Sequence, residues 1–112
     1  MQRRAYDCQA GCPVESTLQF ISGKWKSVIL YHLLEEKVCH FGQLKRDMKD
    51  CSTRMLALQL VELEKDNLIQ KNIYSKEPLR TDYTLTELGL TLEPVIRAMS
   101  DWGDKYNQLN ND

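Results

Sequence analysis

The segment from Cys51 to Asn67, CSTRMLALQLVELEKDN, constrains the fold of this chain more than any other stretch. Ser52 is a good helix N-cap, because its hydroxyl oxygen can accept a hydrogen bond from a backbone N–H that the first helical turn leaves free. Leu56, Leu60 and Leu63 then recur at the i, i+4, i+7 spacing of an amphipathic helix. We therefore expect a helix that buries one side and exposes the other.

The exposed side of this helix begins with two polar residues, Thr53 and Arg54. The N-terminal residues of a recognition helix are the ones that contact base edges in DNA, and Arg binds O6 and N7 of guanine in a fork. Each good pair of this kind contributes about 1–3 kcal/mol of discrimination. The alternative is a solvated helix end without a partner. The pattern favours a DNA-reading helix as the hypothesis to test.

A shorter helix is predicted just before this one. Phe41, Leu44 and Met48 recur at i, i+3, i+7. Only Lys49, Asp50 and Cys51 separate Met48 from the N-cap residue Ser52. Two short helices joined by so tight a turn predict a helix-turn-helix over residues 41–66.

A β-hairpin is predicted directly after these helices, over residues 68–85. Two runs of strand-forming residues, 68–75 and 81–85, flank a turn that extends from Lys76 to Arg80. A hairpin with a basic tip in this place is typical of the wing of a winged helix, which contacts the DNA backbone or minor groove.

The N-terminal part of the chain contains two further predicted helices. Residues 1–11 are polar and are expected to form a flexible arm. Pro13 favours a helix start, so a helix is expected over 13–21 that buries Val14, Leu18 and Ile21. Ser22 and Gly23 end it. The segment from Lys24 is apolar on too many sides for a surface helix and predicts a central buried one, and residues 38–40 are long enough only for a short edge strand.

The C-terminal segment, residues 86–107, predicts a long helix with one apolar seam. Pro94 lies inside it and should kink the helix or divide it in two. The seam residues alternate at spacings of four and three, as in a coiled coil: Leu88, Leu92, Val95, Met99, Trp102 and Tyr106. Such a seam can be intradomain core, but a long extra helix in a short chain needs another surface, and a second copy is the simplest one.

Composition limits the possible classes of protein. The 112 residues suffice for one domain, and 15 basic against 16 acidic residues give a formal net charge of -1, so a nucleic-acid-binding surface would require segregated charges. The chain begins without the apolar region of a signal peptide and has no apolar run near the about 20 residues of a membrane span, so we expect a cytoplasmic protein with no membrane contact. No nucleophile–base pair, phosphate-binding glycine loop or acidic metal cluster indicates an enzyme or a cofactor.

Several short motifs, in order along nearly the whole chain, resemble the HxlR family of bacterial winged-helix regulators, which is akin to the MarR-type regulators. The matching segments are Cys12-Pro13-Val14-Glu15, Gly23-Lys24-Trp25, Phe41-Gly42-Gln43-Leu44, the helix from Ser52 to Glu64, Tyr83-Thr84-Leu85-Thr86-Glu87-Leu88-Gly89, Leu92-Glu93-Pro94-Val95 and Trp102-Gly103. The resemblance implies a mainly α (α+β) winged helix-turn-helix. It also implies a homodimer, whose terminal helices form the interface and which binds operator DNA.

The chain departs from that family on the exposed face of the recognition helix. Ala57 and Leu58 stand where a hydroxyl or amide is usual, and Val61 stands where a basic residue is usual. Three explanations remain open: apolar contact with thymine methyl groups, weaker binding that depends on Arg54 and the wing, or a surface that binds another protein.

Candidate site residues follow from these patterns. Lys26 and Arg46 are further basic residues that could bind phosphate, although most lysines are simply solvated. The candidate DNA-binding residues are Ser52, Thr53, Arg54, Ala57, Leu58, Lys24, Lys45, Lys76 and Arg80. The candidate dimer-interface residues are Val14, Leu18, Leu92, Val95, Met99, Trp102 and Tyr106.

The four cysteines suggest redox chemistry. Cys12 lies at a helix N-terminus, where unpaired amides and the helix dipole would lower the pKa of its thiol, and the resemblance implies that this position senses oxidants or electrophiles in some relatives. Cys51 adjoins the N-cap of the recognition helix and has packing as its default role, but a disulfide from it to Cys12 or Cys8 of the partner subunit would act on that helix directly. With Cys39 and His40 the spacing is too loose to indicate structural zinc.

The sequence therefore predicts a homodimeric, sequence-specific transcriptional regulator that binds a roughly palindromic operator in double-stranded DNA. Cys12 is its candidate sensor of oxidants or electrophiles, and a small-molecule or oxidant effector is a further candidate partner. The alternative is a winged-helix module that binds protein and has no specific DNA affinity. The two differ in their response to salt, since phosphate contacts release counterions and a DNA complex weakens as salt rises.

Overall fold

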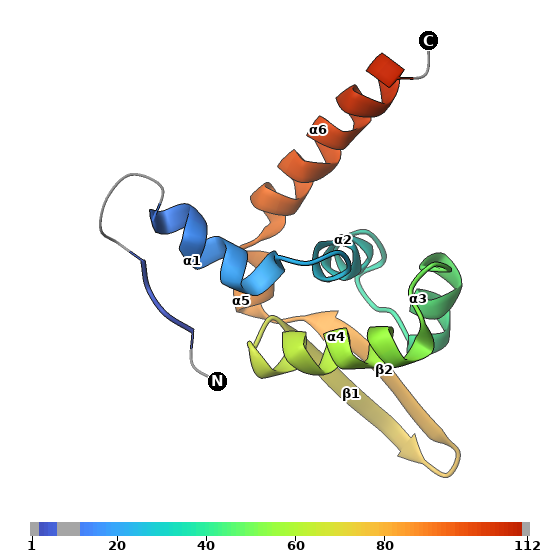
Figure 1. The fold of residues 1–112 in the computed structure, drawn as a ribbon. Coiled ribbons are helices and arrows are strands. Elements are labelled where there is room, and N and C mark those ends of the chain that lie inside the picture. Colours follow the sequence, from blue (N-terminus) through green and yellow to red (C-terminus); the bar gives the residue numbers. More distant parts are fainter. Residues whose placement is uncertain (1–2, 7–11, 111–112) are drawn as a thin grey trace.

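The computed structural model describes residues 3–6 and 12–110 as six helices and one two-stranded sheet (Figure 1). In chain order the elements are α1 (Cys12–Ile21), α2 (Lys26–Glu36), α3 (Phe41–Asp47), α4 (Thr53–Lys65), β1 (Ile69–Lys76), β2 (Leu79–Leu85), α5 (Glu87–Leu90) and α6 (Glu93–Asn110). This is the predicted mainly α winged helix-turn-helix. No helix of the described residues is long and apolar enough to cross a membrane.

The hydrophobic core lies between α2, α3, α4 and the sheet. Helix α4 contributes Leu56, Leu60 and Leu63 to this core, each at most 2% exposed. The predicted buried side of that helix is therefore confirmed. Ile29, Leu30 and Leu33 of α2, Leu44 of α3 and Ile69 of β1 complete its centre. The central position predicted for α2 is confirmed as well, because three of its side chains are almost fully buried.

The junction after α4 is tightly hydrogen-bonded. Asn67 has a left-handed φ of 61°, and the Leu68 N–H donates to the Leu63 carbonyl over 3.0 Å, which closes the helix end. The Leu68 carbonyl in turn accepts from the Thr86 N–H over 3.1 Å. Gly89 is buried against that same carbonyl oxygen, where an added Cβ would collide with it. The end of α4 and the start of α5 are therefore held together.

The two strands form an antiparallel hairpin in a register that runs from Ile69↔Leu85 to Lys76↔Leu79, with an irregularity between Ile73 and Ser75. The predicted hairpin is confirmed, but its turn is shorter than the expected 76–80. Only Glu77 and Pro78 lie between the strands, joined by a cis peptide bond. Residues 38–40, expected to form at most a short edge strand, form only an isolated antiparallel bridge from Cys39 to Tyr83.

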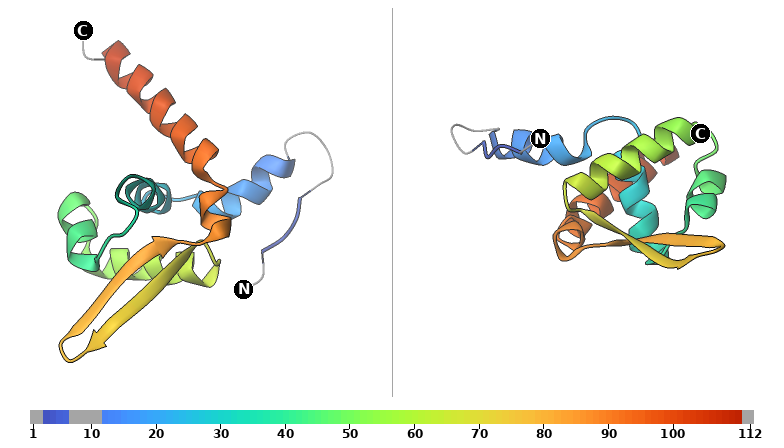
Figure 2. Two further views of the ribbon diagram at one scale, coloured as in Figure 1. Left: turned by 180° about the vertical axis from the view of Figure 1, so that it is seen from behind. Right: turned by 90° about the horizontal axis from the view of Figure 1, so that it is seen from below.

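The C-terminal segment is divided rather than continuous. The break falls at Thr91 and Leu92, and Pro94 becomes the second residue of α6, where a missing amide costs no hydrogen bond. Helix α6 leaves the body on the side opposite to α4 and the hairpin and points away from it, as two views agree (Figures 1 and 2). The molecule thus has one end that carries the helix-turn-helix and wing, and another that carries the projecting helix.

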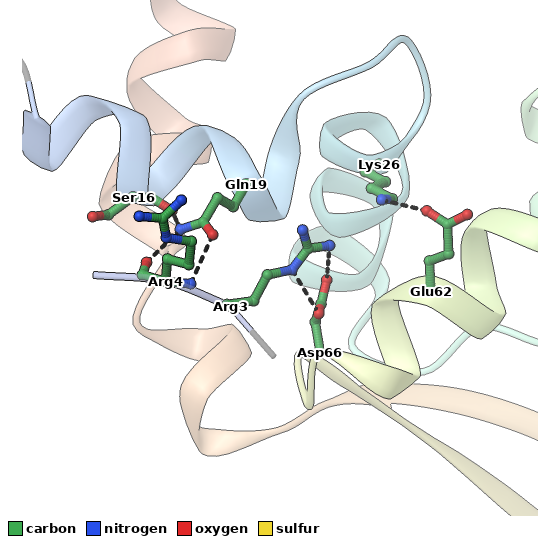
Figure 3. A network of polar contacts seen from close by, with 7 residues as sticks. All are labelled: Arg3, Arg4, Ser16, Gln19, Lys26, Glu62 and Asp66. Carbon is green, nitrogen blue, oxygen red and sulfur yellow. Dashed lines mark hydrogen bonds and ion pairs between the residues drawn. The ribbon is translucent and has the colours of Figure 1, made fainter. Parts of the chain in front are cut away.

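The described part of the N-terminal arm is held in place, in contrast to the expected flexible arm. The Arg4 N–H donates to Gln19 Oε1 over 2.8 Å, and the Tyr6 N–H donates to Ser16 Oγ over 2.8 Å. Arg3 reaches the end of α4 and pairs with Asp66 (Figure 3). Ser16 and Gln19 of α1 thus accept hydrogen bonds from backbone N–H groups of this extended segment, and Asp66 at the end of α4 pairs with its Arg3 side chain. The sequence of the segment by itself has no regular pattern.

Candidate nucleic-acid interface

The helix-turn-helix is fixed by a cap at the start of each helix. His40 Nδ1 accepts from the Gln43 N–H over 3.1 Å at α3, and Ser52 Oγ accepts from the Met55 N–H over 3.0 Å at α4. The predicted N-cap is confirmed, and the hydroxyl oxygen of Ser52 is engaged with its own helix. Met48 and Cys51, in the turn between the helices, are at most 3% exposed and anchor it to the core.

The outer side of α4 is accessible along its length. Thr53, Arg54, Ala57 and Leu58 are all exposed, as a DNA-contacting surface requires. Val61 is exposed too, at 45%, so the apolar character read from the sequence lies on the surface of the recognition helix. Contact of these residues with DNA stays a prediction.

The predicted basic contacts differ in their surroundings. Lys76 and Arg80 are exposed on the two strands of the wing near its turn. Lys24 is exposed before α2 with its Nζ 4.8 Å from the centroid of the Trp25 ring, and Lys45 is half-buried near the end of α3. Binding of these four residues to DNA phosphates stays a prediction.

Lys26 is not available for phosphate, contrary to the sequence interpretation. Its residue is 8% exposed, and its Nζ lies 2.6 Å from Glu62 Oε1 on α4 (Figure 3). The sequence showed only a lysine between Trp25 and Ser27, and the acidic partner lies 36 positions further along the chain. The pair joins α2 to α4 and compensates an acidic charge on the recognition helix.

A second ion pair holds the C-terminal end of α4. Arg3 donates from Nε to Asp66 Oδ1 over 2.9 Å and from Nη2 to Asp66 Oδ2 over 2.8 Å, a bidentate pair (Figure 3). The Asp66 side chain is only 6% exposed, and this hydrogen-bonded carboxylate raises the pKa of Arg3. Two acidic groups near the end of the recognition helix, Glu62 and Asp66, are therefore matched by cations from other elements.

The candidate interface residues separate into two groups. Leu92 and Val95 are half-buried and pack against the subunit's own core, so within the subunit they act partly as core residues. The others are exposed to an extent unusual for large apolar side chains: Val14 60%, Leu18 46%, Met99 45%, Trp102 68% and Tyr106 53%. Trp102 and Tyr106 stack with ring centroids 5.6 Å apart. An exposed apolar stripe of this kind indicates an interaction surface.

The base of α6 is attached to α2. Ile96 is 2% exposed in the core, and Arg97 Nη1 lies 2.8 Å from Glu35 Oε1. Hydrogen bonds from Arg97 and then Tyr31 lower the pKa of Glu35. Helix α2 therefore contacts α6 through Arg97 and α4 through Lys26.

A family model for HxlR-like helix-turn-helix proteins matches residues 20–111. The chain belongs to this family. It is 50% identical over 96 residues to an HTH-type transcriptional regulator of Bacillus subtilis (strain 168), YdeP, a match that covers 86% of this chain and 74% of YdeP. This chain is a helix-turn-helix transcriptional regulator.

Two solved structures extend the comparison. The redox regulator HypR in its oxidized form superposes with a TM-score of 0.80 at 40% identity, covering 90% of this chain and 99% of HypR. The reduced form of the transcriptional regulator YodB from B. subtilis gives a TM-score of 0.70 at 30% identity, covering 85% of this chain and 93% of YodB. Both share the fold of this HxlR-like chain.

The cysteines of this HxlR-like chain lie in different environments. Cys12 is the first residue of α1 and is disulfide-bonded, whereas Cys39 and Cys51 are free and buried. Burial raises the pKa of the Cys39 thiol to about 11 and also raises that of Cys51, where nearby Lys45 and Lys24 oppose it. A buried thiol with a raised pKa is a poor nucleophile, which favours packing as the role of Cys51. Cys8 lies outside the described residues.

Sequence reasoning missed several residues of this surface. Leu109 extends the α6 stripe, 79% exposed, because the helix continues to Asn110 rather than ending near residue 107. Its spacing of three from Tyr106 could have shown this. The Arg3–Asp66 pair joins residues 63 positions apart, which no local pattern can show. Among the described residues, no group of three or more His, Cys, Asp or Glu is arranged to hold a metal ion.

Proposed function

We propose that two copies of this chain form a homodimer that binds a roughly palindromic operator in double-stranded DNA, in the cytoplasm. Thr53 and Arg54 at the start of α4 contact base edges in the major groove. Lys24, Lys45 and the wing residues Lys76 and Arg80 bind phosphates beside it. Two recognition helices then enter successive major grooves, about 34–36 Å apart.

The observation that carries this proposal is the division of the exposed surface between the two ends of the molecule. The outer side of α4 and the basic residues of the wing lie at one end, and the apolar stripe of α6 projects from the other (Figure 1). A stripe that contains Trp102 and Tyr106 at more than half exposure is unfavourable in water, and a second copy would cover it. Pairing through α6 leaves α4 free for DNA.

Redox sensing through Cys12 is the second part of the proposal. The similar structures HypR and YodB are named as a redox regulator and as a transcriptional regulator studied in reduced form. Cys12 is disulfide-bonded in this chain, which is the state that an oxidant would produce. In the reduced protein, an oxidant such as diamide would join the thiol of Cys51 to that of Cys12 or Cys8 of the partner subunit and take up two electrons and two protons. The turn before α4 would have to open for this bond, because Cys51 is 1% exposed. Oxidation by that route would therefore act directly on the DNA-reading helix.

The main test is a fluorescence-anisotropy titration onto the DNA upstream of the protein's own gene and onto a scrambled duplex, at about 50 and 200 mM salt. We expect preference for the upstream DNA and a steep loss of affinity with salt. Arg54→Ala should weaken specific binding about 5- to 150-fold, as expected for one forked base contact. Lys105→Ala, which removes an exposed cation from α6, is the matched control. Equal, salt-insensitive binding to both duplexes would instead favour the protein-interaction module.

The redox part is tested by repeating the titration with reduced and diamide-treated protein. We expect oxidation to change operator affinity in the wild type and to have no effect in Cys12→Ser. Non-reducing gels of wild type and Cys51→Ser distinguish a bond between subunits from one within a subunit. If specific binding by the wild type were unchanged by oxidant, the DNA-binding part of the proposal would hold and redox sensing through Cys12 would be excluded.

A further inference from the structure

Four residues form a single line along the outer side of the recognition helix. Arg54, Leu58, Val61 and Lys65 follow one another at i, i+4, i+7 and i+11, which places them on one face of α4. That face is opposite to the one formed by Leu56, Leu60 and Leu63, which are buried. Leu58 is 48% and Val61 45% exposed. We call the four residues the outer stripe.

The outer stripe is charged at its ends and aliphatic in the middle. Eleven residues of helix span about 16 Å, whereas the major groove is about 12 Å wide. Lys65 at one end of the stripe can therefore reach a phosphate that borders the groove, while Arg54 at the other end contacts a base and Leu58 and Val61 face the base edges between them. A surface with a cation at each end and an apolar centre fits DNA better than it fits an apolar protein surface.

The middle of the stripe cannot read hydrogen-bonding groups, because Leu58 and Val61 have no donor or acceptor. The polar side chains near it are engaged within the subunit: Glu62 pairs with Lys26, and Gln59 Nε2 donates to Met55 Sδ over 3.2 Å. Placing aliphatic groups against the polar edges of G·C pairs would bury those edges without partners. The apolar group that the major groove does offer is the C5-methyl group of thymine.

We propose that Leu58 and Val61 read thymine methyl groups, so that each operator half-site carries thymine where the middle of α4 faces the groove. This inference rests on the proposed function and adds the chemistry by which the site is read. Specificity at these positions then comes from apolar contact, and specificity at the helix start comes from the hydrogen bonds of Arg54.

The experiment uses the operator mapped by footprinting on the upstream DNA. Each thymine of a half-site, with its symmetry mate, is replaced by deoxyuridine, which removes the methyl group and keeps every hydrogen-bonding group. We expect one or two positions at which wild-type affinity falls about fourfold for each methyl group lost, or about sixteenfold for the symmetric pair. Substitution elsewhere in the site should have little effect.

Protein variants assign the effect to the stripe. Leu58→Ala and Val61→Ala should bind the natural operator more weakly and lose the response to deoxyuridine at the position each one contacts. The matched control is the double variant Met55→Ala, Gln59→Ala, because Met55 is an exposed apolar residue, at 37%, on the same helix but off the stripe, and removing it alone would free the Gln59 amide that donates to Met55 Sδ. It should keep the full response. None of these four side chains is buried, so the variants should fold, which circular dichroism checks.

The outcomes separate the inference from the function on which it rests. Specific operator binding that no deoxyuridine substitution weakens would overturn the thymine reading and leave the regulator intact. A deoxyuridine effect of unchanged size in both stripe variants would overturn it too. Absence of any preference for the upstream DNA over a scrambled duplex would refute the proposed function itself.

Discussion

Gly89 occupies a position in this fold that no other residue type could fill without movement. It is buried in α5, and a Cβ there would collide with the carbonyl oxygen of Leu68 and lie 3.2 Å from Leu85 Cδ2. The same carbonyl accepts the Thr86 N–H, and Thr86 Oγ1 donates to the Asn67 carbonyl over 2.6 Å. The close approach made possible by Gly89 thus connects the end of the recognition helix to the segment that leads into α6.

Replacing Gly89 by Ala should destabilise the protein by about 1–3 kcal/mol, the usual cost of forcing an extra group into a packed site. The measurement is the free energy of unfolding in urea at one fixed protein concentration, because the proposed dimerisation would link stability to concentration. Gly42→Ala is the control, since a Cβ there would meet only ordinary contacts, the nearest at 3.5 Å from His40 Nδ1. Equal stability of the two variants would contradict this account of Gly89.

At the scale of elements, the sequence predicts the features that neighbouring residues determine and misses those that depend on residues distant in the chain. Both ends of α4 follow from neighbouring residues, since Ser52 caps its start and Asn67 takes the left-handed conformation after its end. The burial of Lys26 could not be predicted, because its carboxylate partner, Glu62, comes from a helix distant in sequence. The order of the arm depends on Arg3 and Asp66 in the same way. Local patterns predicted the helices and the hairpin, and long-range ion pairs decided which charged residues remain free.

The arm and α4 should be energetically coupled through the Arg3–Asp66 pair. We expect a double-mutant cycle of Arg3→Ala and Asp66→Ala to give a coupling of about 1.5–3 kcal/mol, because the two hydrogen bonds are charge-assisted and the carboxylate is nearly buried. Chemical denaturation of the four proteins measures it.

Arg4→Ala is the matched control for this cycle. The Arg4 side chain is exposed, and its hydrogen bonds to Gln19 are made by backbone atoms that alanine retains. Its cycle with Asp66→Ala should give no coupling. A coupling of the same size for Arg3 and Arg4 would show that charge alone, and not the bidentate contact, stabilises the end of α4.

At the scale of the whole molecule, the projecting part of α6 carries apolar side chains that the subunit itself leaves uncovered and that the proposed dimer would cover. Its first turns contact the core through Ile96, but the stripe of Met99, Trp102, Tyr106 and Leu109 remains exposed within the subunit. The seam spacing predicted this helix and most of these residues. The spacing did not show that Leu92 and Val95, at the N-terminal end of the seam, pack against the subunit's own core. The spacing is the same in every turn of the helix, whereas contact with the core depends on where α6 projects from the rest of the subunit.

Trp102→Glu should convert the proposed dimer into monomers, because it places a charge in the middle of the stripe and removes the ring that stacks on Tyr106. Sedimentation at micromolar concentration measures the change, and operator affinity should fall with it, since a monomer contacts only one half-site. Asn107→Glu adds the same charge to the same helix away from the stripe and should remain dimeric. A monomeric wild type, or a dimeric Trp102→Glu, would exclude this interface.

The two ion pairs of α2 give that helix a geometric role. Through Glu35 it holds the base of α6, and through Lys26 it holds α4. In a dimer joined along α6, α2 is therefore the spacer that sets how far each reading helix stands from the symmetry axis. The length of the operator's central segment would then be specified by a helix that never touches a base, and DNA with a longer or shorter centre would be rejected even when both half-sites are perfect.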